Sequence, residues 1–401
     1  MHHATRTLSL IASLSTAGLL AACGGGGSGS GSEPAAAAGT LSVSLTDAPS
    51  CGYDAVNVTV NKVRVNKNAS ASDTDGGWTD ITLNPARKIN LLNLTNGVLD
   101  PLGQTALDSG HYSQLRLVLD PNTGNTLANS VVLSGSKTEI SLDTPSAVQS
   151  GLKLGHEFDV AAGQRVDLVL DFDACKSIVT KGNGKYALKP VINVIPTVLN
   201  GISGFVSGGA NVIVSAQQNG VIMRATAPNA TTGEFYLARV VPGNYDVVIT
   251  ADARSTAVIA AVPVATTTTT TVVSTAAVPI ALQIAAAGRD ISGRITYPVN
   301  YADAGYVGAQ QTFSAGPKVT VRYQGIDVTT GAYTIANLPT SAPLLGAYST
   351  TLPIVFAPKG DTTPGTGKYT VEASAVGLTS KTVTPVDLTT SSQTNVNLTL
   401  Q

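Results

Sequence analysis

Short stretches in which apolar and polar residues alternate recur through most of this 401-residue chain. The pattern appears first at residues 41–46 and returns at 56–60, 115–119 and 166–172. A period of two places neighbouring side chains on opposite faces of an extended strand. Gly, Asn, Asp and Pro separate the stretches at intervals of about ten residues, so the sequence predicts an all-β fold built from sandwich or barrel units.

One of these stretches changes phase partway along. Val56, Val58 and Val60 share one face, but the alternation resumes at Val63, one residue out of step. A single extra residue in one strand of a pair produces this kind of slip. We therefore expect a β-bulge at Asn61-Lys62.

Composition supports the β prediction and narrows the range of partners. Only 12% of the residues are charged, whereas Gly and Pro number 40 and 20. Such a composition indicates many turns and differs from that of helical proteins. The formal net charge is −1 and no basic stripe is present, so we expect no nucleic-acid partner.

The N-terminus carries an export signal. An apolar run from Leu8 ends in Leu20-Ala21-Ala22-Cys23, and a Gly/Ser-rich stretch follows at 24–32. The run is too short for a membrane-spanning helix, which needs about 20 apolar residues. Small residues before a cysteine are typical of a bacterial lipoprotein signal. An ordinary cleaved secretory signal with an incidental cysteine is the alternative.

The lipoprotein interpretation sets a location. Residues 1–22 would be removed, Cys23 would carry the lipid, and residues 23–38 would form a flexible tether. Several acyl chains hold a protein firmly at a membrane. Gly24, rather than Asp, follows the cysteine, which by analogy with similar lipoproteins favours the outer membrane. We expect the protein to face the periplasm or the cell exterior.

The other two cysteines are expected to form a disulfide. Export exposes Cys51 and Cys175 to an oxidising compartment. A metal site or a reactive thiol is the alternative, and the lack of a nearby CxxC partner argues against metal.

An internal repeat divides the rest of the chain. Gly201-Ile202-Ser203-Gly204 and Ile291-Ser292-Gly293 begin two similar units, which contain Tyr245-Asp246-Val247 and Tyr369-Thr370-Val371 respectively. Units of about 90 residues fit small sandwich domains. We therefore expect three sandwich-type modules in tandem, at residues 39–197, 200–286 and 287–401, here called the first, second and third segments.

The first segment resembles the bacterial family called domain of unknown function 4382. The resemblance is carried by Thr46-Asp47-Ala48-Pro49, Trp78, Gly110-His111-Tyr112, Leu115-Arg116-Leu117 and the stretch 166–173. Their order and spacing match over the whole segment. The resemblance implies a lipoprotein context and no particular activity.

The second and third segments are similar to carboxypeptidase-regulatory-like, or transthyretin-like, sandwiches. Each has a Gly-x-Phe/Tyr-x-Leu/Ile strand before a Pro turn, at Gly233 and at Gly331. The third segment lacks the glycine after Pro339 and inserts about 30 residues before Tyr369. Such modules are grouped with carbohydrate-binding-like folds, although a fold alone does not establish sugar binding.

The chain offers little catalytic chemistry. After signal removal only His111 and His156 remain, and the histidine that a His-Glu-x-x-His zinc motif needs is missing after His156-Glu157. No Gly-x-Ser-x-Gly elbow, phosphate-binding loop or dinucleotide fingerprint occurs. We expect a protein that is not an enzyme and needs no cofactor. An envelope hydrolase would require a carboxylate pair in a cleft, for which the sequence gives no evidence.

Asp171 and Asp173 are weak metal candidates. Alternate residues share a strand face, which would bring these two carboxylates together, and carboxylate oxygens suit Ca²⁺. The favoured interpretation is a solvated outer face opposite an apolar stripe, with no metal bound.

Aromatic residues provide the best candidates for ligand binding. Tyr297, Tyr301 and Tyr306 lie in a loop-like insertion, with Tyr323 nearby in sequence, and tyrosines on loops give rigid contact area with a polar tip. Trp78 either stacks on a sugar or anchors the core. Since other tyrosines of the repeats occupy framework positions, core packing is the alternative for this cluster as well.

The sequence thus predicts a membrane-anchored, non-catalytic envelope lipoprotein that acts as a structural or adhesive scaffold. Its partners would be the membrane, through the lipid, and an envelope protein or polysaccharide. A carbohydrate-binding protein of the cell envelope is the alternative.

Overall fold

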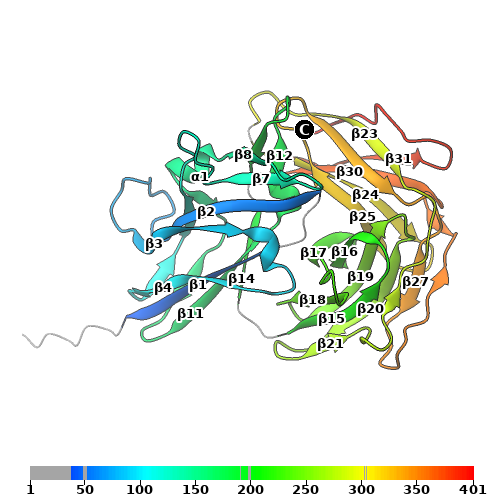
Figure 1. Cartoon of the computed structure of the whole chain (residues 1–401). Helices are drawn as coiled ribbons and strands as arrows, with labels where there is room; N and C mark the ends of the chain where they lie inside the picture. Colours follow the sequence, from blue (N-terminus) through cyan, green and yellow to red (C-terminus); the bar gives the residue numbers. More distant parts are fainter. Residues whose placement is uncertain (1–37, 48–51, 190, 197–199, 302, 304) are drawn as a thin grey trace, which may run out of the picture. The chain divides into compact units, whose positions relative to one another are not determined.

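The alternating stretches form strands, and the fold is nearly all β, as the sequence predicts (Figure 1). The computed structural model describes residues 38–47, 52–189, 191–196, 200–301, 303 and 305–401. The predicted signal, Cys23, nearly all of the tether, and Cys51 lie outside these residues. The described residues belong to one compact unit. None of the described helices is long and apolar enough to span a membrane.

The first segment is built on two main sheets. A four-stranded sheet has the order β14-β11-β1-β4. Its strands are β1 (Gly39–Asp47), β4 (Asp100–Leu107), β11 (Arg165–Phe172) and β14 (Ile192–Pro196). An eight-stranded sheet has the order β12-β13-β8-β7-β2-β6-β9, with β3 paired to β2. Its strands are β2 (Tyr53–Asn66), β3 (Thr79–Asn90), β6 (Gln114–Leu119), β7 (Ser130–Leu133), β8 (Glu139–Asp143), β9 (Leu152–Leu154), β12 (Ile178–Thr180) and β13 (Tyr186–Leu188).

Short elements complete this segment. β5 (Gly110–Tyr112) pairs with β10 (Phe158–Val160), and a 3-10 turn, η1 (Leu91–Leu94), follows β3. The helices α1 (Pro145–Gln149) and α2 (Ala174–Ser177) are each about one turn long. The core consists of the apolar residues of the alternating strands, and Leu41, Val43 and Leu45 are fully buried.

The predicted bulge is confirmed. The pairing of β2 shifts register between Val60 and Lys62 against both β3 and β6. The shift keeps Val60 and Val63 buried on either side of the extra residue. The slip in the sequence pattern therefore marks a real irregularity in the strand.

The second and third segments share one topology, which bears out the repeat. The second has a small sheet β18-β15-β21, with β22 on β15, and a larger sheet that begins β17-β16-β19-β20. The third has β26-β23-β32 and β25-β24-β30-β31, with β29 on β24. The second segment's strands are β15 (Gly201–Ser207), β16 (Ala210–Gln218), β17 (Val221–Thr226), β18 (Glu234–Ala238), β19 (Gly243–Asp252), β20 (Ala257–Val264), β21 (Thr270–Val272) and β22 (Ile280–Ala281). The third segment's are β23 (Arg289–Thr296), β24 (Gly305–Phe313), β25 (Lys318–Gly325), β26 (Ala332–Leu338), β27 (Leu344–Ala347), β28 (Ala357–Pro358), β29 (Thr362–Thr363), β30 (Lys368–Ala375), β31 (Lys381–Asp387) and β32 (Leu398–Thr399).

The repeated glycine has a physical reason. Gly233 and Gly331 both have φ of +72°, and each carbonyl accepts a backbone hydrogen bond, from Val206 and Ile295 respectively. A Cβ at either glycine would lie 2.1 Å from a backbone oxygen. Only a residue without a side chain fits this left-handed, closely packed turn.

The repeated tyrosine also keeps its role. The hydroxyl of Tyr245 donates to the carbonyl of Val241 and that of Tyr369 to the carbonyl of Pro339, each at 2.6 Å. Both rings are almost fully buried. These two tyrosines are framework residues, as the sequence suggested.

The insertion of the third segment joins the sheet of the second. β27 pairs in parallel with β20, Ala257 opposite Leu344, and β28 pairs with β27. The larger sheet of the second segment therefore has the order β17-β16-β19-β20-β27-β28. Leu344 and Ile354 pack into the core of residues 202–282.

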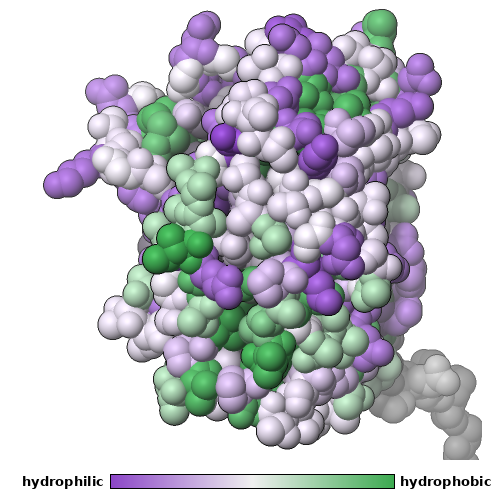
Figure 2. Space-filling model, turned by 90° about the vertical axis from the view of Figure 1, so that its right-hand side faces the viewer, coloured by the Kyte–Doolittle hydropathy of each residue, from purple (hydrophilic) through white to green (hydrophobic). Residues whose placement is uncertain are grey.

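Exposed apolar residues also occur. Ile284, Val299 and Val355 are each more than four-fifths exposed. Figure 2 shows one face of the molecule, on which apolar side chains gather mainly in the lower half and are interrupted by polar ones.

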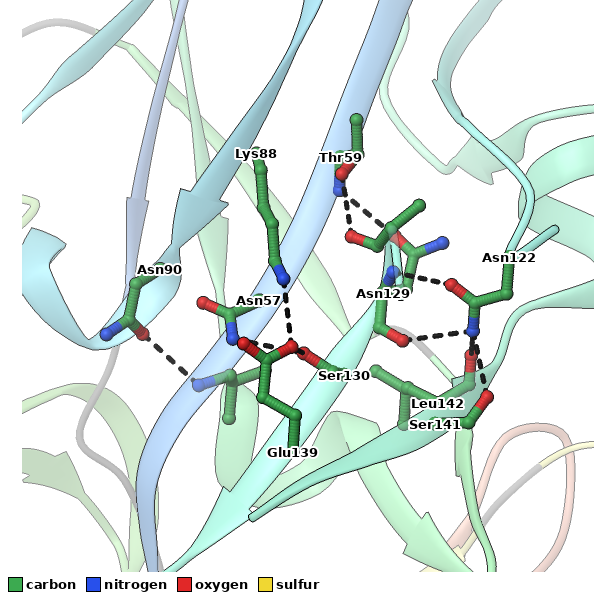
Figure 3. Close-up of polar contacts among 12 residues, drawn as sticks. Asn57, Thr59, Lys88, Asn90, Asn122, Asn129, Ser130, Glu139, Ser141 and Leu142 are labelled. Atoms are coloured by element: carbon green, nitrogen blue, oxygen red, sulfur yellow. Dashed lines mark hydrogen bonds and ion pairs between the residues drawn. The ribbon is translucent and has the colours of Figure 1, made fainter. Parts of the chain in front are cut away.

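A hydrogen-bonded network of asparagines fixes the pairing of β2, β7 and β8 (Figure 3). Asn129 is fully buried; its side-chain oxygen accepts from the amide of Thr59 at 3.0 Å, and its Nδ2 donates to the carbonyl of Asp120 at 2.7 Å. Asn122 in turn bonds Asn129 and Leu142. Backbone groups of Thr59, Asp120 and Leu142 are thus satisfied by side chains.

We expect Asn129→Ala to lower the free energy of unfolding by about 2 to 4 kcal/mol, because it leaves a buried N–H and a buried C=O without partners. Urea denaturation of both proteins measures the change. Asn125→Ala, at an exposed turn position, is the matched control and should change stability little. Equal stability of the Asn129 variant and the wild type would contradict this assignment.

Candidate functional site

The strongest candidate site is a groove on the sheet of the third segment, here called the tyrosine groove. Strands β25, β24 and β30 lie side by side (Figure 1) and form its floor. The groove encloses about 250 Å³. Its lining includes Lys176, Asn219, Gly220, Tyr306, Gly308, Gln310, Lys318, Tyr323, Glu372, Ser374 and Ser380.

Strand register explains how these side chains converge. Gly308 on β24 lies opposite Tyr323 on β25 and opposite Glu372 on β30. Tyr306 and Gln310 are two residues away on either side, so they share the face of Gly308. The missing side chain at Gly308 leaves the hollow between Tyr323 and Glu372.

The tyrosines predicted from sequence separate into two groups. Tyr297 and Tyr301 stack at 5.2 Å with 13° between their planes, and the hydroxyl of Tyr301 donates to the carbonyl of Val376 at 2.8 Å. Burial raises the pKa of Tyr297 to about 12. Tyr306 instead lines the groove, where 38% of it is exposed.

A lysine from the first segment lies against the groove tyrosines. The ammonium of Lys176 is 5.1 Å from the ring centres of both Tyr306 and Tyr323, within the range of a cation–π contact. Asp173 holds this lysine at 3.2 Å. The hydroxyl of Tyr323 is buried and has no hydrogen-bond partner among the described residues. Burial, followed by the charge of Asp173, raises the pKa of Tyr323 well above its usual value.

Polar groups line the other side of the groove. The Nε2 of Gln310 donates to Glu372 at 2.6 Å, while Oε1 of Gln310 has no partner among the described residues. Lys318 lies 3.8 Å from the same carboxylate. The hydroxyls of Ser374 and Ser380 are 2.9 Å apart.

A tight hairpin closes one edge. Asn219 and Gly220 connect β16 to β17, and both have positive φ, at 51° and 79°. Asn-Gly is the preferred pair for such a two-residue turn. The carbonyl of Gly220 accepts from the hydroxyl of Thr320 at 2.7 Å, which ties the turn to the floor.

A second depression, on the first segment, is larger but lacks aromatic residues. It encloses about 810 Å³ and is lined by Lys88, Asp120 and Glu139 among others. Glu139 accepts from Ser130 at 2.7 Å and from Lys88 at 2.9 Å (Figure 3), and these bonds lower its pKa. Since Glu139 is already paired and the network around it fixes strands, we assign this region a structural role.

Trp78 is engaged by two arginines. The guanidinium carbons of Arg64 and Arg116 each lie 4.5 Å from its ring centre, and its indole N–H donates to the carbonyl of Ser72. Arg116 is 1% exposed and bonds Gln114 and the carbonyls of Ala71 and Ser150. Trp78 therefore covers a buried cation, which favours the core-anchor interpretation of this residue.

The expectation of a solvated face at Asp171 and Asp173 is wrong. Both residues are at least nine-tenths buried. Asp171 lies 3.3 Å from Arg224 of β17. Asp173 comes after the end of β11 and caps α2 by accepting from the amide of Lys176. The sequence pattern missed the burial of Asp171 because Arg224, which lies against it, belongs to the second segment.

Cations of the chain itself occupy the positions beside these carboxylates. Arg224 faces Asp171, and Lys176 faces Asp173. Among the described residues, no three His, Cys, Asp or Glu side chains converge in a geometry that could hold a metal ion. Burial raises the pKa of Asp171 to about 6, against the opposing effect of Arg224.

One charged cluster was not foreseen. His111 lies 2.9 Å from Asp159, its cross-strand partner, and 3.2 Å from Glu157. Hydrogen bonds to these carboxylates raise the pKa of the exposed histidine. The register between β5 and β10 places His111 opposite Asp159, and no spacing in the sequence predicts this pair.

Cys175 is buried and disulfide-bonded. Cys51, the partner that the sequence predicts, lies outside the described residues. The Cys51–Cys175 pairing stays a prediction.

The sheets described above define a nearly all-β protein. Residues 38–190 match the family described as "Domain of unknown function (DUF4382)", which confirms the resemblance of the first segment. No curated protein matches the chain.

Two of the solved structures that match the chain are distant likenesses. The chain is similar to the Bacillus anthracis TIE protein at 11% identity and a TM-score of 0.15, over 90% of this chain and 50% of that one. It thus spans half the length of that protein. A streptococcal ancillary pilin matches at 8% identity and a TM-score of 0.16, over 90% and 99%. TM-scores this low carry no argument about function.

The buried carboxyl group of Asp171 leads us to expect that the stability of the protein depends on pH. Its pKa of about 6 in the folded chain exceeds the ordinary 3.8, so between these values the folded state binds more protons than the unfolded state. Stability from this group is therefore present at low pH and lost as pH rises through about 6. The stability of wild type minus that of Asp171→Asn should fall by roughly 2 kcal/mol from pH 4 to pH 7. Denaturation of both proteins across this range measures it, and a flat or rising difference would contradict the assignment.

Thiol chemistry tests the cysteine pairing. We expect Cys51 and Cys175 to resist alkylation in the unfolded, exported protein until a reductant is added, because a disulfide has no free thiolate. Mass spectrometry of the alkylated peptides before and after reduction gives the result. Free thiols at both positions without reduction would refute the pairing.

Proposed function

We propose that this chain is a non-catalytic interaction scaffold of the bacterial cell envelope, anchored through a lipid on Cys23. The single observation that carries the proposal is the set of buried and partly buried polar contacts joining the three segments. Contacts of this kind keep binding surfaces at fixed spacing, which suits a scaffold better than a chain of freely hinged modules.

The first and second segments are joined by an ion pair and by the hydrogen bonds of Asn96. Arg224 of β17 pairs with Asp171 of β11. The side-chain oxygen of Asn96 accepts from the amide of Tyr236 at 3.1 Å, and the amide of Asn96 donates to the hydroxyl of Thr226 at 2.8 Å. Removing one partner would leave the other buried and unpaired.

The third segment is held in a similar way. Gln217 of β16 makes two 2.8 Å bonds to the backbone of Thr320, one to its carbonyl and one from its amide. Asp252 pairs with Arg322 at 2.7 Å, and Asp327 accepts from Thr180 at 2.6 Å. These contacts connect every pair of segments.

The finer parts of the proposal rest on the sequence. The lipobox supports the lipid anchor and the outer-membrane location, and the lack of catalytic motifs supports a non-enzymatic role. The shared topology of the second and third segments supports their assignment as carboxypeptidase-regulatory-like modules. A second candidate function, carbohydrate binding at the envelope, is favoured by the exposed ring of Tyr306 in a polar groove.

Fractionation of expressing cells tests the anchor. We expect wild type in the outer-membrane fraction and Cys23→Ala in the soluble fraction, because the variant has no acyl attachment site. Ser30→Ala, in the same tether, is the control and should stay with the membrane. Continued membrane retention of the Cys23 variant would remove the anchor from the proposal.

Crosslinking of intact cells tests the scaffold itself. A scaffold gives discrete crosslinked partners with wild type, and these are lost or reduced when Cys23→Ala displaces the chain. An anchored chain without any crosslinked envelope protein or polymer would count against a scaffold.

A further inference from the structure

We propose that the tyrosine groove binds an acidic oligosaccharide, with one sugar ring on Tyr306 and a sugar carboxylate at Lys318. This proposal rests on the second candidate function, carbohydrate binding, and gives it a site and a ligand class. It is argued from three features of the groove: its aromatic wall, its polar lining and its charge.

The aromatic wall suits the apolar face of a sugar ring. Tyr306 is 38% exposed, whereas Tyr323 behind it is 9% exposed and Tyr369 is 1% exposed. An aromatic ring at a solvent-facing groove supplies rigid contact area at little entropic cost. Lys176, which is paired with Asp173, lies 5.1 Å from the ring centres of both Tyr306 and Tyr323.

The hollow has room for a ring beside that wall. Gly308 contributes no side chain between Tyr323 and Glu372. The volume of about 250 Å³ lies just below the range of about 300–1,000 Å³ for small-molecule sites. This suits one or two rings of a longer chain that continues past the groove edge.

The polar lining suits hydroxyl groups. Ser374 and Ser380, whose hydroxyls bond each other, offer one further donor and free acceptor lone pairs, and Glu372 accepts. Oε1 of Gln310 is an acceptor with no partner among the described residues, and a buried unpaired acceptor costs free energy until a donor reaches it. Alternating donors and acceptors beside an aromatic ring are what a polyhydroxylated ring needs.

The charge of the lining favours an acidic sugar. Lys176 and Lys318 are the cations and Glu372 the carboxylate among the lining residues, two against one. Lys176 is held by Asp173 at 3.2 Å, whereas the ion pair of Lys318 within the described part of the chain is a longer one, 3.8 Å to Glu372, and its side chain is 41% exposed. Lys318 is therefore the cation available to a ligand carboxylate.

Isothermal titration of the full-length chain in a neutral detergent tests the proposal. Tetragalacturonic acid is the acidic probe, and cellotetraose is the neutral one. We expect binding of the acidic probe with at least about tenfold lower Kd than the neutral probe, and weaker binding as added salt screens the charges. Absence of binding by the acidic probe, or equal Kd for both, overturns the proposal.

Substitutions in the tyrosine groove test whether the acidic probe binds there. Tyr306→Ala and Lys318→Gln should each raise the Kd of the acidic probe at least about tenfold. Tyr301→Ala and Lys368→Gln, matched residues outside the groove lining, should leave it unchanged. Gly308→Ala is a further probe that removes no polar group. Its Cβ would meet Thr320 at an ordinary 3.4 Å, so the fold tolerates it, while the added methyl reduces the hollow and should weaken binding.

Binding that survives Tyr306→Ala and Gly308→Ala overturns the groove as the site. The outcome is separable from that of the scaffold proposal. If the protein leaves the membrane only when Cys23 is replaced by Ala, yet binds no saccharide, the anchored-scaffold proposal stands and the acidic-oligosaccharide proposal is wrong.

Discussion

Charges buried between segments are the constraint on which the arrangement of this protein depends. Asp171 lies near the end of β11 and Asp173 directly follows that strand, and both are at least nine-tenths buried. A buried carboxylate is tolerated only when cations or hydrogen-bond donors replace water. Arg224 of the second segment and Lys176 of the short helix α2 supply that replacement, so the first segment cannot part from the second without exposing or orphaning these groups.

The same charges shape the groove. Asp173 holds Lys176, and Lys176 in turn lies on the rings of Tyr306 and Tyr323. The aromatic wall of the third segment is thus positioned by a carboxylate of the first. Any site built there belongs to the joined segments and would not be present in the third segment alone.

Periodic features of the fold were predictable, and contacts between segments were not. Alternation placed the strands at 41–46 and 56–65, including the bulge near Asn61, because a period of two is local information. Gly233 and Gly331 revealed a repeat because a left-handed turn permits few residues other than glycine.

The burial of Asp171 was not predicted because Arg224, which lies against it, has no periodic relation to β11. Tyr306 and Tyr301 lie in different places because β24 begins at Gly305 and includes Tyr306 but not Tyr301. The composition of the insertion did not indicate where this strand begins. His111 and Asp159 met through register alone.

The strand β27 has a consequence for how the chain is made. It reaches the sheet of the second segment from beyond β26, so the edge at β20 stays uncovered until residues 344–358 have emerged. A polypeptide synthesised from its N-terminus presents that bare edge for the time needed to make the intervening residues. Unpaired edges of this kind are where chains associate wrongly. Wrong association at this edge is therefore favoured in the interval between the appearance of β20 and that of β27.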